Sequence, residues 1–533
     1  MDLLTGVRGA TRGGAGCSKA VNGALALALG LGLVACPGGR PDDQAGLGRR
    51  LVTGTVKSLL ASADGTRLAI LDGCVEVKGR FLPPGTSTCD LRVLSTAGGA
   101  AQVVARAVPT LPHGAVFAPE GNGLAALADY DFESGAGRLV MVHDGVAVEV
   151  ARGVTFHGFV PGGGGSVAVV SEGRFLVADP DGRVLGRHRA SMFGSFELRR
   201  RADGSVVGLA RTQGAHRGAL FGVELGKLDR PGAPIAEGTA DFALAPGGKA
   251  FAYSITGKRG TELFLTGDLN RRPGRVAEGA RSFVFAPDGT ALAWVSEAAP
   301  GKQGDLLVAS PGGTPQRLGR EVGEYRWATA APRLAWLEQY DPRGRAGVLG
   351  VGGSGAVPRT FGRSVSDFEI SPDGARVAFL RHTVEGGYSV DLWAGDVSGE
   401  PRKLARGVFG FSFAPDGRWL YYRTRCTRNG DACDLERVEM GGAEAKPQEL
   451  ARGVKSFEFD PRDPARLLLT WQRADLVALD FGLWRDGKST PVDRGALPGS
   501  VRFLGPDSKR IAFAVVQPKR AGAYVAVVSP VGE

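Results

Sequence analysis

The sequence predicts an all-β protein, a β-propeller of about eleven four-stranded blades. Three observations support this prediction: a short motif recurs along the chain, its copies are about 40 to 46 residues apart, and glycine is abundant, with 83 of 533 residues. The clearest copies read FSFAPDGRWLYYR from Phe411, FVFAPDGTALAWV from Phe283 and FEISPDGARVAFL from Phe368. Eleven copies can be aligned, and a period of this length is typical of propeller blades.

Each motif copy reads as a hairpin. In FSFAPDG, Phe411 and Phe413 alternate with Ser412 and fall on one face of a strand. Pro415 and the Asp-Gly pair that follows it provide the backbone angles and side-chain acceptor that a tight turn needs. A second strand follows, and two further strands complete the blade. Such a sheet has two apolar faces, so we expect it to be stable only between neighbours.

The two ends of the repeat region complement each other. The segment RLVTGTVK from Arg50 reads as a fourth strand without its first three, whereas the C-terminal VRFLG, RIAFAVV and AYVAVVS read as three strands without a fourth. We therefore expect the N-terminal strand to close the last blade. Because propellers usually hold four to eight blades, the sequence favours two propellers, over residues 50–320 and 321–533.

The N-terminus predicts export. Residues 1–35 combine a basic head with the apolar run ALALALGLGLVA, which is too short for the roughly 20 residues of a membrane-spanning helix. The sequence LVAC at its end resembles a bacterial lipoprotein box, in which Cys36 would carry a diacylglycerol. The alternative is an ordinary secretory signal. Residues 36–49 would then be a short linker that follows the lipidated cysteine.

Four further cysteines form two local pairs. Cys74 with Cys89 and Cys426 with Cys433 each enclose a short loop. Because disulfides persist in oxidising compartments, both pairs are predicted to be disulfides, in agreement with export. A four-cysteine zinc site would require CxxC spacings, which the sequence lacks.

The repeat resembles a known family. The pattern F-x-PDG followed by alternating apolar residues is similar to the TolB-type, WD-like propeller repeat of bacterial envelope proteins, over residues 50–530. TolB itself has an additional N-terminal α/β domain, for which the residues between Cys36 and the first strand leave no room. The resemblance implies a propeller in the cell envelope that binds other proteins, and it transfers no binding residue.

Two glycine-rich segments match phosphate-binding patterns without the required context. Residues 482–489 fit GxxxxGK[ST], but prolines and glycines follow where a helix should begin, so a hairpin tip is predicted. Residues 350–355 echo a dinucleotide loop and also lack a helix. No cofactor is predicted.

A calcium candidate consists of Asp129, Asp131 and Glu133 at alternate positions in a predicted loop. Its glycine is misplaced for an EF-hand, and a solvated acidic tip is the alternative. The six histidines lack the spacings that place two ligands on one metal. No catalytic residue is predicted, and no metal site other than this candidate.

These features predict a lipid-anchored envelope protein, facing the periplasm or held at the outer membrane, whose propeller is a binding platform for a protein or glycan. The sequence predicts no enzymatic activity, because no nucleophile elbow or hydrolase domain is present. The alternative is a propeller enzyme of lactonase, cyclase or lyase type. The formal charge is +10, but basic and acidic residues alternate, so a nucleic-acid partner is not expected. A third reading is an assembly subunit.

Overall fold

The computed structural model describes residues 48–79, 82–188, 192–213, 218–229, 232–257, 260–296, 303–382, 390–441, 446–473 and 478–528. Within the unit 45–533 these residues form an all-β propeller, as predicted. The leader, the lipobox cysteine Cys36 and residues 37–47 lie outside the described residues.

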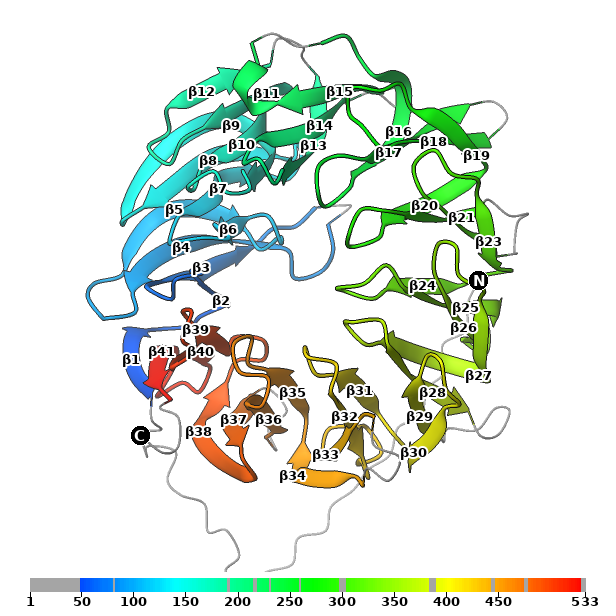
Figure 1. Cartoon of the computed structure of the whole chain (residues 1–533). Helices are drawn as coiled ribbons and strands as arrows, with labels where there is room; N and C mark the ends of the chain where they lie inside the picture. The colour runs from blue at the N-terminus through cyan, green and yellow to red at the C-terminus, as the bar shows by residue number, and fades with distance from the viewer. Residues whose placement is uncertain are drawn as a thin grey trace, which may run out of the picture. The chain divides into compact units, whose positions relative to one another are not determined.

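The strands form eleven antiparallel blades, and in most of them four consecutive strands make up the sheet (Figure 1). The first blade contains β2 (Ser58–Ala61), β3 (Arg67–Glu76), β4 (Ser87–Ser95) and β5 (Gln102–Pro109). The second blade contains β6 (Ala115–Phe117), β7 (Leu124–Asp131), β8 (Ala136–His143) and the first part of β9 (Val146–Phe159). The third blade contains the rest of β9 with β10 (Val167–Ser171), β11 (Arg174–Ala178) and β12 (Val184–Arg187).

The next three blades share the same meander. The fourth blade contains β13 (Phe193–Arg200), β14 (Val206–Thr212), β15 (Gly218–Glu224) and the first part of β16 (Ala236–Leu244). The fifth blade contains the rest of β16 with β17 (Phe251–Gly257), β18 (Gly260–Thr266) and β19 (Gly274–Glu278). The sixth blade contains β20 (Ala280–Phe285), β21 (Leu292–Ser296), β22 (Leu306–Ala309) and β23 (Gln316–Gly319). A short 3-10 helix, η1 (Leu225–Lys227), follows β15.

The seventh to ninth blades have the same antiparallel meander. The seventh blade contains β24 (Glu324–Trp327), β25 (Leu334–Asp341), β26 (Ala346–Gly352) and the first part of β27 (Arg359–Ile370). The eighth blade contains the rest of β27 with β28 (Arg376–His382), β29 (Val390–Asp396) and β30 (Arg402–Arg406). The ninth blade contains β31 (Gly410–Phe413), β32 (Trp419–Thr424), β33 (Cys433–Glu439) and β34 (Gln448–Val454).

The last two blades contain both chain ends of the described fold. They are β35 (Ser456–Phe459), β36 (Leu467–Gln472), β37 (Leu479–Arg485) and β38 (Lys488–Ala496); and β39 (Arg502–Leu504), β40 (Arg510–Val515), β41 (Gly522–Val527) and β1 (Gly48–Thr53). Strand β1 pairs with β41 in antiparallel register, from Gly48 opposite Ala526 to Thr53 opposite Gly522. The expected completion of the last blade by the N-terminal strand is therefore present.

The motif forms the turn that its sequence predicts. In the sixth blade, the Ala286 N–H donates to the Ala291 carbonyl at 2.8 Å, and Gly289 adopts a φ of 72°. Asp288 Oδ1 accepts from the N–H and the hydroxyl of Thr290, at 3.0 and 2.8 Å. The aspartate thus stabilises the turn, and the glycine takes a backbone angle that other residues rarely adopt.

The core lies between blades. Eleven clusters of buried apolar side chains are present, and each one joins two consecutive blades. The cluster of Leu59, Ile70, Ala512 and Val525 joins the first blade to the eleventh. Because every blade face is covered by a neighbour, the packing forms a closed series, as the repeat architecture requires.

The packing differs from the expected division near residue 320. Leu318 of the sixth blade and Trp336 of the seventh share one buried cluster, so the core continues across this position. Residues 45–533 are one compact unit, in which eleven blades follow each other to closure. The motif sets the form of each blade, whereas the packing between sheets sets how many blades complete a ring.

Three arginines connect consecutive blades at the start of their second strand. Arg376 Nη1 donates to the Gly417 carbonyl at 3.0 Å, Arg466 Nη2 donates to the Ser508 carbonyl, and Arg510 Nη2 donates to the Gly65 carbonyl at 3.3 Å. Each bond reaches the motif turn of the next blade. We call these residues the staple arginines.

Candidate functional site

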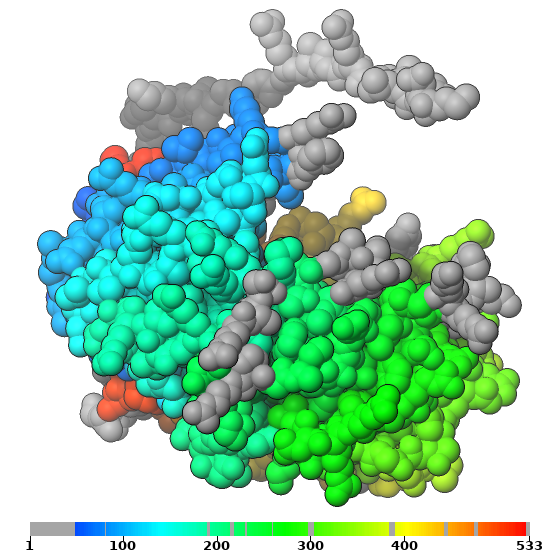
Figure 2. Space-filling model, turned by 90° about the horizontal axis from the view of Figure 1, so that it is seen from above, coloured from blue at the N-terminus to red at the C-terminus, as the bar shows by residue number. Residues whose placement is uncertain are grey.

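Two neighbouring cavities lie on one face of the propeller, at blades 4 to 6. In an antiparallel meander, the loops after the first and third strands of every blade lie on the same face. Both cavities are formed at such loops, and the loop between β18 and β19 contributes residues to each. Figure 2 shows blades 4 to 6, in shades of green, lying side by side.

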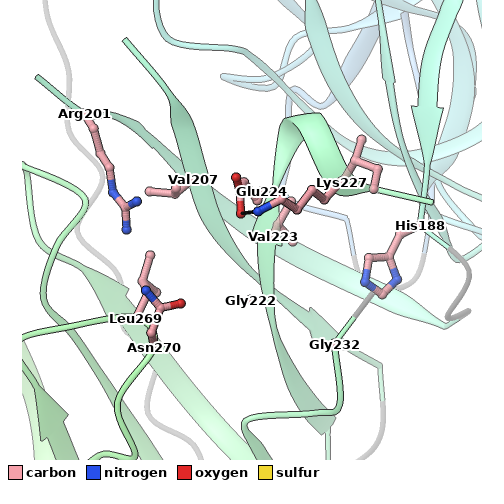
Figure 3. A pocket seen from close by; sticks show the side chains of 11 residues that line it. His188, Arg201, Val207, Gly222, Val223, Glu224, Lys227, Gly232, Leu269 and Asn270 are labelled. Atoms are coloured by element: carbon pink, nitrogen blue, oxygen red, sulfur yellow. Dashed lines mark hydrogen bonds and ion pairs between the residues drawn. The ribbon is translucent and has the colours of Figure 1, made fainter. Parts of the chain in front are cut away.

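The first cavity measures about 300 Å³ and lies between blades 4 and 5. Figure 3 shows Arg201 and Asn270 toward one end and His188 toward the other. Between them, Lys227 Nζ lies 3.1 Å from Glu224 Oε2 in an exposed ion pair. Burial lowers the pKa of His188, which keeps its ring neutral at pH 7. The cavity therefore offers hydrogen-bonding groups, and its charged residues Arg201, Lys227 and Glu224 leave one positive charge.

The second cavity is larger, about 630 Å³, and we call it the arginine cavity. Its wall contains three arginines and one acidic residue, with glycines and Pro311 from the neighbouring blade; the charged members are Asp268, Arg271, Arg272 and Arg275. A pocket of this size lies within the usual range for small-ligand sites, about 300 to 1,000 Å³.

The three arginines differ in how they are paired. Arg275 Nη1 contacts Glu262 at 2.8 Å and Glu278 at 2.6 Å, and both acids raise its pKa. Arg271 Nε lies 3.9 Å from Asp268 Oδ2, and 83% of its side chain is exposed. Within the described part of the chain, Arg272 makes no ion pair or hydrogen bond, and it acts on Tyr253 only through its charge. Positive charge is therefore available at this cavity.

The staple position differs at these blades. The residue that accepts the closing hydrogen bond of the motif turn is Ala250 in blade 5 and Ala291 in blade 6, whereas it is an arginine in blades 1, 7, 8 and 10. An alanine cannot reach the next blade. The arginines near this part of the face instead belong to the β18–β19 loop and to β19. The sequence analysis predicted neither feature, although Arg376, two places after the motif glycine Gly374, was a readable signal in blade 8.

A second group of charged residues lies on the inner strands of blades 7 to 9. Arg326 crosses from β24 to β27, donates to the Phe368 carbonyl at 2.7 Å and stacks over the Phe368 ring. Glu369 crosses from β27 to β31, where its Oε1 accepts from the Phe413 N–H at 3.3 Å. Burial raises the pKa of Glu369 to about 7, with a smaller contribution from Asp367. This carboxyl titrates near neutral pH.

The predicted cysteine pairs lie at disulfide distance. The Sγ atoms of Cys74 and Cys89 are 2.02 Å apart, and those of Cys426 and Cys433 are 2.05 Å apart. Both join the second and third strands of a blade, so they lie on the face opposite the cavities. Predicted lipidation at Cys36 concerns a residue outside the described ranges.

The calcium candidate does not converge on one point. Asp129 pairs with Arg138 at 2.8 Å, whereas Asp131 accepts from the N–H groups of Glu133 and Ser134 at 3.0 and 3.1 Å. The three residues therefore form an acidic hairpin tip. Across the described ranges, no group of three or more His, Cys, Asp and Glu residues could hold a metal ion.

The phosphate-loop match is also a hairpin. Arg485 pairs with Lys488, and Asp486 and Gly487 form the tip with φ values of 48° and 80°. This is the predicted turn between the third and fourth strands of the tenth blade. Residues 350–355 begin in β26 and continue into the turn after it, with no helix following. No helix among the described residues is long and apolar enough to cross a membrane.

Comparison with known proteins found similar solved structures of low identity. No family model and no curated protein matches the chain. Similar solved structures include the β-propeller domain of the Trilobed protease from Pyrococcus furiosus, with 13% identity, a TM-score of 0.27, and coverage of 56% of this chain and 98% of that one. Another is oligogalacturonate lyase in complex with manganese, with 14% identity, a TM-score of 0.28, and coverage of 63% of this chain and 96% of that one. A third is Pyrococcus horikoshii acylaminoacyl peptidase, with 14% identity, a TM-score of 0.27, and coverage of 60% of this chain and 57% of that one.

These structures correct one prediction. The sequence reading expected no enzymatic activity, and this exclusion is contradicted because the similar structures include a lyase and a peptidase. At this identity the likeness concerns the fold, and a fold hosts many functions. No activity is transferred to this chain.

Proposed function

We propose that this protein is an exported, lipid-anchored envelope protein of the TolB-like propeller type, and that it binds a partner through the face that carries the two cavities. The supporting observation is the pair of cavities on either side of the β18–β19 loop. Loops on a rigid scaffold are where binding residues concentrate. A closed propeller holds such loops in fixed positions, so a partner meets a preformed surface.

The cavities can be filled without disturbing the core. Gly232 lines the first cavity and Gly274 the arginine cavity, and a Cβ at either position would meet no atom within 4 Å. We therefore expect Gly232→Tyr and Gly274→Tyr to fold and to obstruct the cavities. Gly247 has equal space in a turn on the same face of blade 5 but lines neither cavity, so Gly247→Tyr separates binding in the cavities from binding elsewhere on this face.

The test is affinity capture from envelope extract with the tagged full chain. The proposal predicts a partner that is retained by the wild type and Gly247→Tyr and lost with both cavity variants. Equal retention by all four proteins would contradict binding at this face.

Anchoring is tested separately by cell fractionation. The proposal predicts that the wild-type chain is found with membranes and that Cys36→Ala is released to the soluble fraction. An unchanged distribution would contradict lipidation at this cysteine.

A further inference from the structure

We propose that the arginine cavity binds the carboxylate of an acidic oligosaccharide whose neighbouring sugar occupies the first cavity. The inference rests on the proposed function, because it names the ligand class of the same face. Three arginines and one aspartate line this cavity, whereas the first cavity contains a lysine–glutamate pair and an amide.

One of the three arginines is available to an oxyanion, because the other two lie beside acidic side chains. Arg275 is held in place by Glu262 and Glu278, which leaves it oriented along β19. Arg272 has no acidic partner among the described residues, so its guanidinium can pair with a ligand carboxylate. A guanidinium binds a carboxylate through two parallel hydrogen bonds, which gives both strength and direction.

Space for the ligand comes from glycine. Gly274 and Gly312 line the cavity, and a Cβ at either position would contact nothing within 4 Å. The wall contains no aromatic side chain among the residues that form it. Its polar and charged side chains outnumber its apolar ones, which are Leu265, Val276 and Pro311, so this wall favours a polar ligand.

The shared loop favours a chain-like ligand. Leu269 and Asn270 line the first cavity, and the adjacent Arg271 and Arg272 line the arginine cavity. Two cavities separated by a single loop suit consecutive units of a narrow chain. A sugar hydroxyl can donate and accept, which matches the Asn270 amide and the Glu224–Lys227 pair in the first cavity.

The test is calorimetric titration of the purified full-length protein. The acidic probe is a hexasaccharide of alternating glucuronate and N-acetylglucosamine, and the neutral probe is a glucose hexamer. We expect the acidic probe to bind and the neutral probe to bind at least about tenfold more weakly, because a charge-assisted hydrogen bond is lost. Equal affinity for both probes, or no binding of the acidic probe, would overturn the proposal.

Variants locate the binding to the arginine cavity. Arg272→Gln should weaken the acidic probe about tenfold, whereas Arg343→Gln, which removes an exposed arginine from the opposite face at the β25–β26 turn, should leave affinity unchanged. Equal losses in both variants would indicate general charge attraction and would overturn the site. Inorganic phosphate that binds as tightly as the hexasaccharide would overturn the oligosaccharide assignment.

Failure of this inference is distinguishable from failure of the proposed function. A partner captured by the wild type and by Arg272→Gln alike, but lost with Gly274→Tyr, would support the binding face and overturn the acidic ligand.

Discussion

Blades 8, 10 and 11 use arginine differently from blades 5 and 6. In the first group, an arginine at the start of the second strand donates to the motif turn of the next blade. In the second group that position holds Ala250 or Ala291, and the arginines nearby line a cavity. An arginine therefore joins blades where its guanidinium donates to the next blade, whereas Arg272 is available to a ligand because it has no partner among the described residues.

The first prediction concerns the most buried staple arginine. Arg466 is 7% exposed and pairs with Asp460, which is fully buried. Arg466→Met leaves that buried carboxylate without its cation, with only the Arg462 N–H still donating to it at 2.9 Å, so we expect a loss of about 3 to 5 kcal/mol in unfolding free energy. Urea denaturation measures this change in the free energy of unfolding.

The double variant Asp460→Asn/Arg466→Met is the control for Arg466→Met, because it removes both charges. We expect it to recover part of the lost stability. If Arg466→Met were as stable as the wild type, the Arg466–Asp460 pair would contribute nothing to the contact between blades 10 and 11.

A smaller effect is predicted for a half-exposed staple. Arg376 donates to the Gly417 carbonyl and lies 3.4 Å from Asp396. Arg376→Gln removes a charge-assisted bond between blades 8 and 9, which should lower stability by about 1 to 2 kcal/mol in urea unfolding.

The equivalent residue in blade 7 provides a matched control for Arg376→Gln. The Arg333 side chain donates no hydrogen bond to any described residue, so Arg333→Gln should change stability by less than about 0.5 kcal/mol. Equal losses in both variants would remove the distinction between a staple and an ordinary arginine.

The inner strands show a third use of charge, which depends on pH. The pKa of Glu369 is raised from its ordinary 4.5 to about 7 by burial. Between these pH values the unfolded chain releases the proton and the folded chain retains it, so this group makes the fold less stable as pH rises through that window. Arg326 and Asp367 are the charged groups that face it.

Glu369→Gln removes this titration and keeps an acceptor for the Phe413 N–H. We therefore expect the melting temperature of the variant, relative to the wild type, to be higher at pH 8 than at pH 5, as measured by calorimetry. A difference that is independent of pH would mean that Glu369 titrates normally in the folded protein.

Much of the fold could be predicted because each blade is encoded locally. Phe283, the motif turn and the strand after it follow from a dozen consecutive residues, and the pairing of β1 with β41 follows from the phase of the two chain ends. The number of rings could not be predicted, because it depends on how closely neighbouring sheets pack, for example at Trp336.

The candidate site was beyond the sequence for a related reason. The arginine cavity combines Arg272 with Pro311 from the next blade, and the first cavity combines Arg201 with Asn270. No local motif connects these residues. Only the packing of consecutive blades brings their loops together.

The most direct measurement compares ligand-induced thermal shifts in three proteins: wild type, Arg272→Gln and Arg376→Gln. A ligand that binds the folded state raises the melting temperature. With the glucuronate-containing hexasaccharide, we predict a similar upward shift for the wild type and Arg376→Gln, although the latter starts from a lower melting temperature, and little or no shift for Arg272→Gln. An equal shift in all three proteins, or a shift lost only in Arg376→Gln, would contradict the division between staple arginines and the arginine cavity.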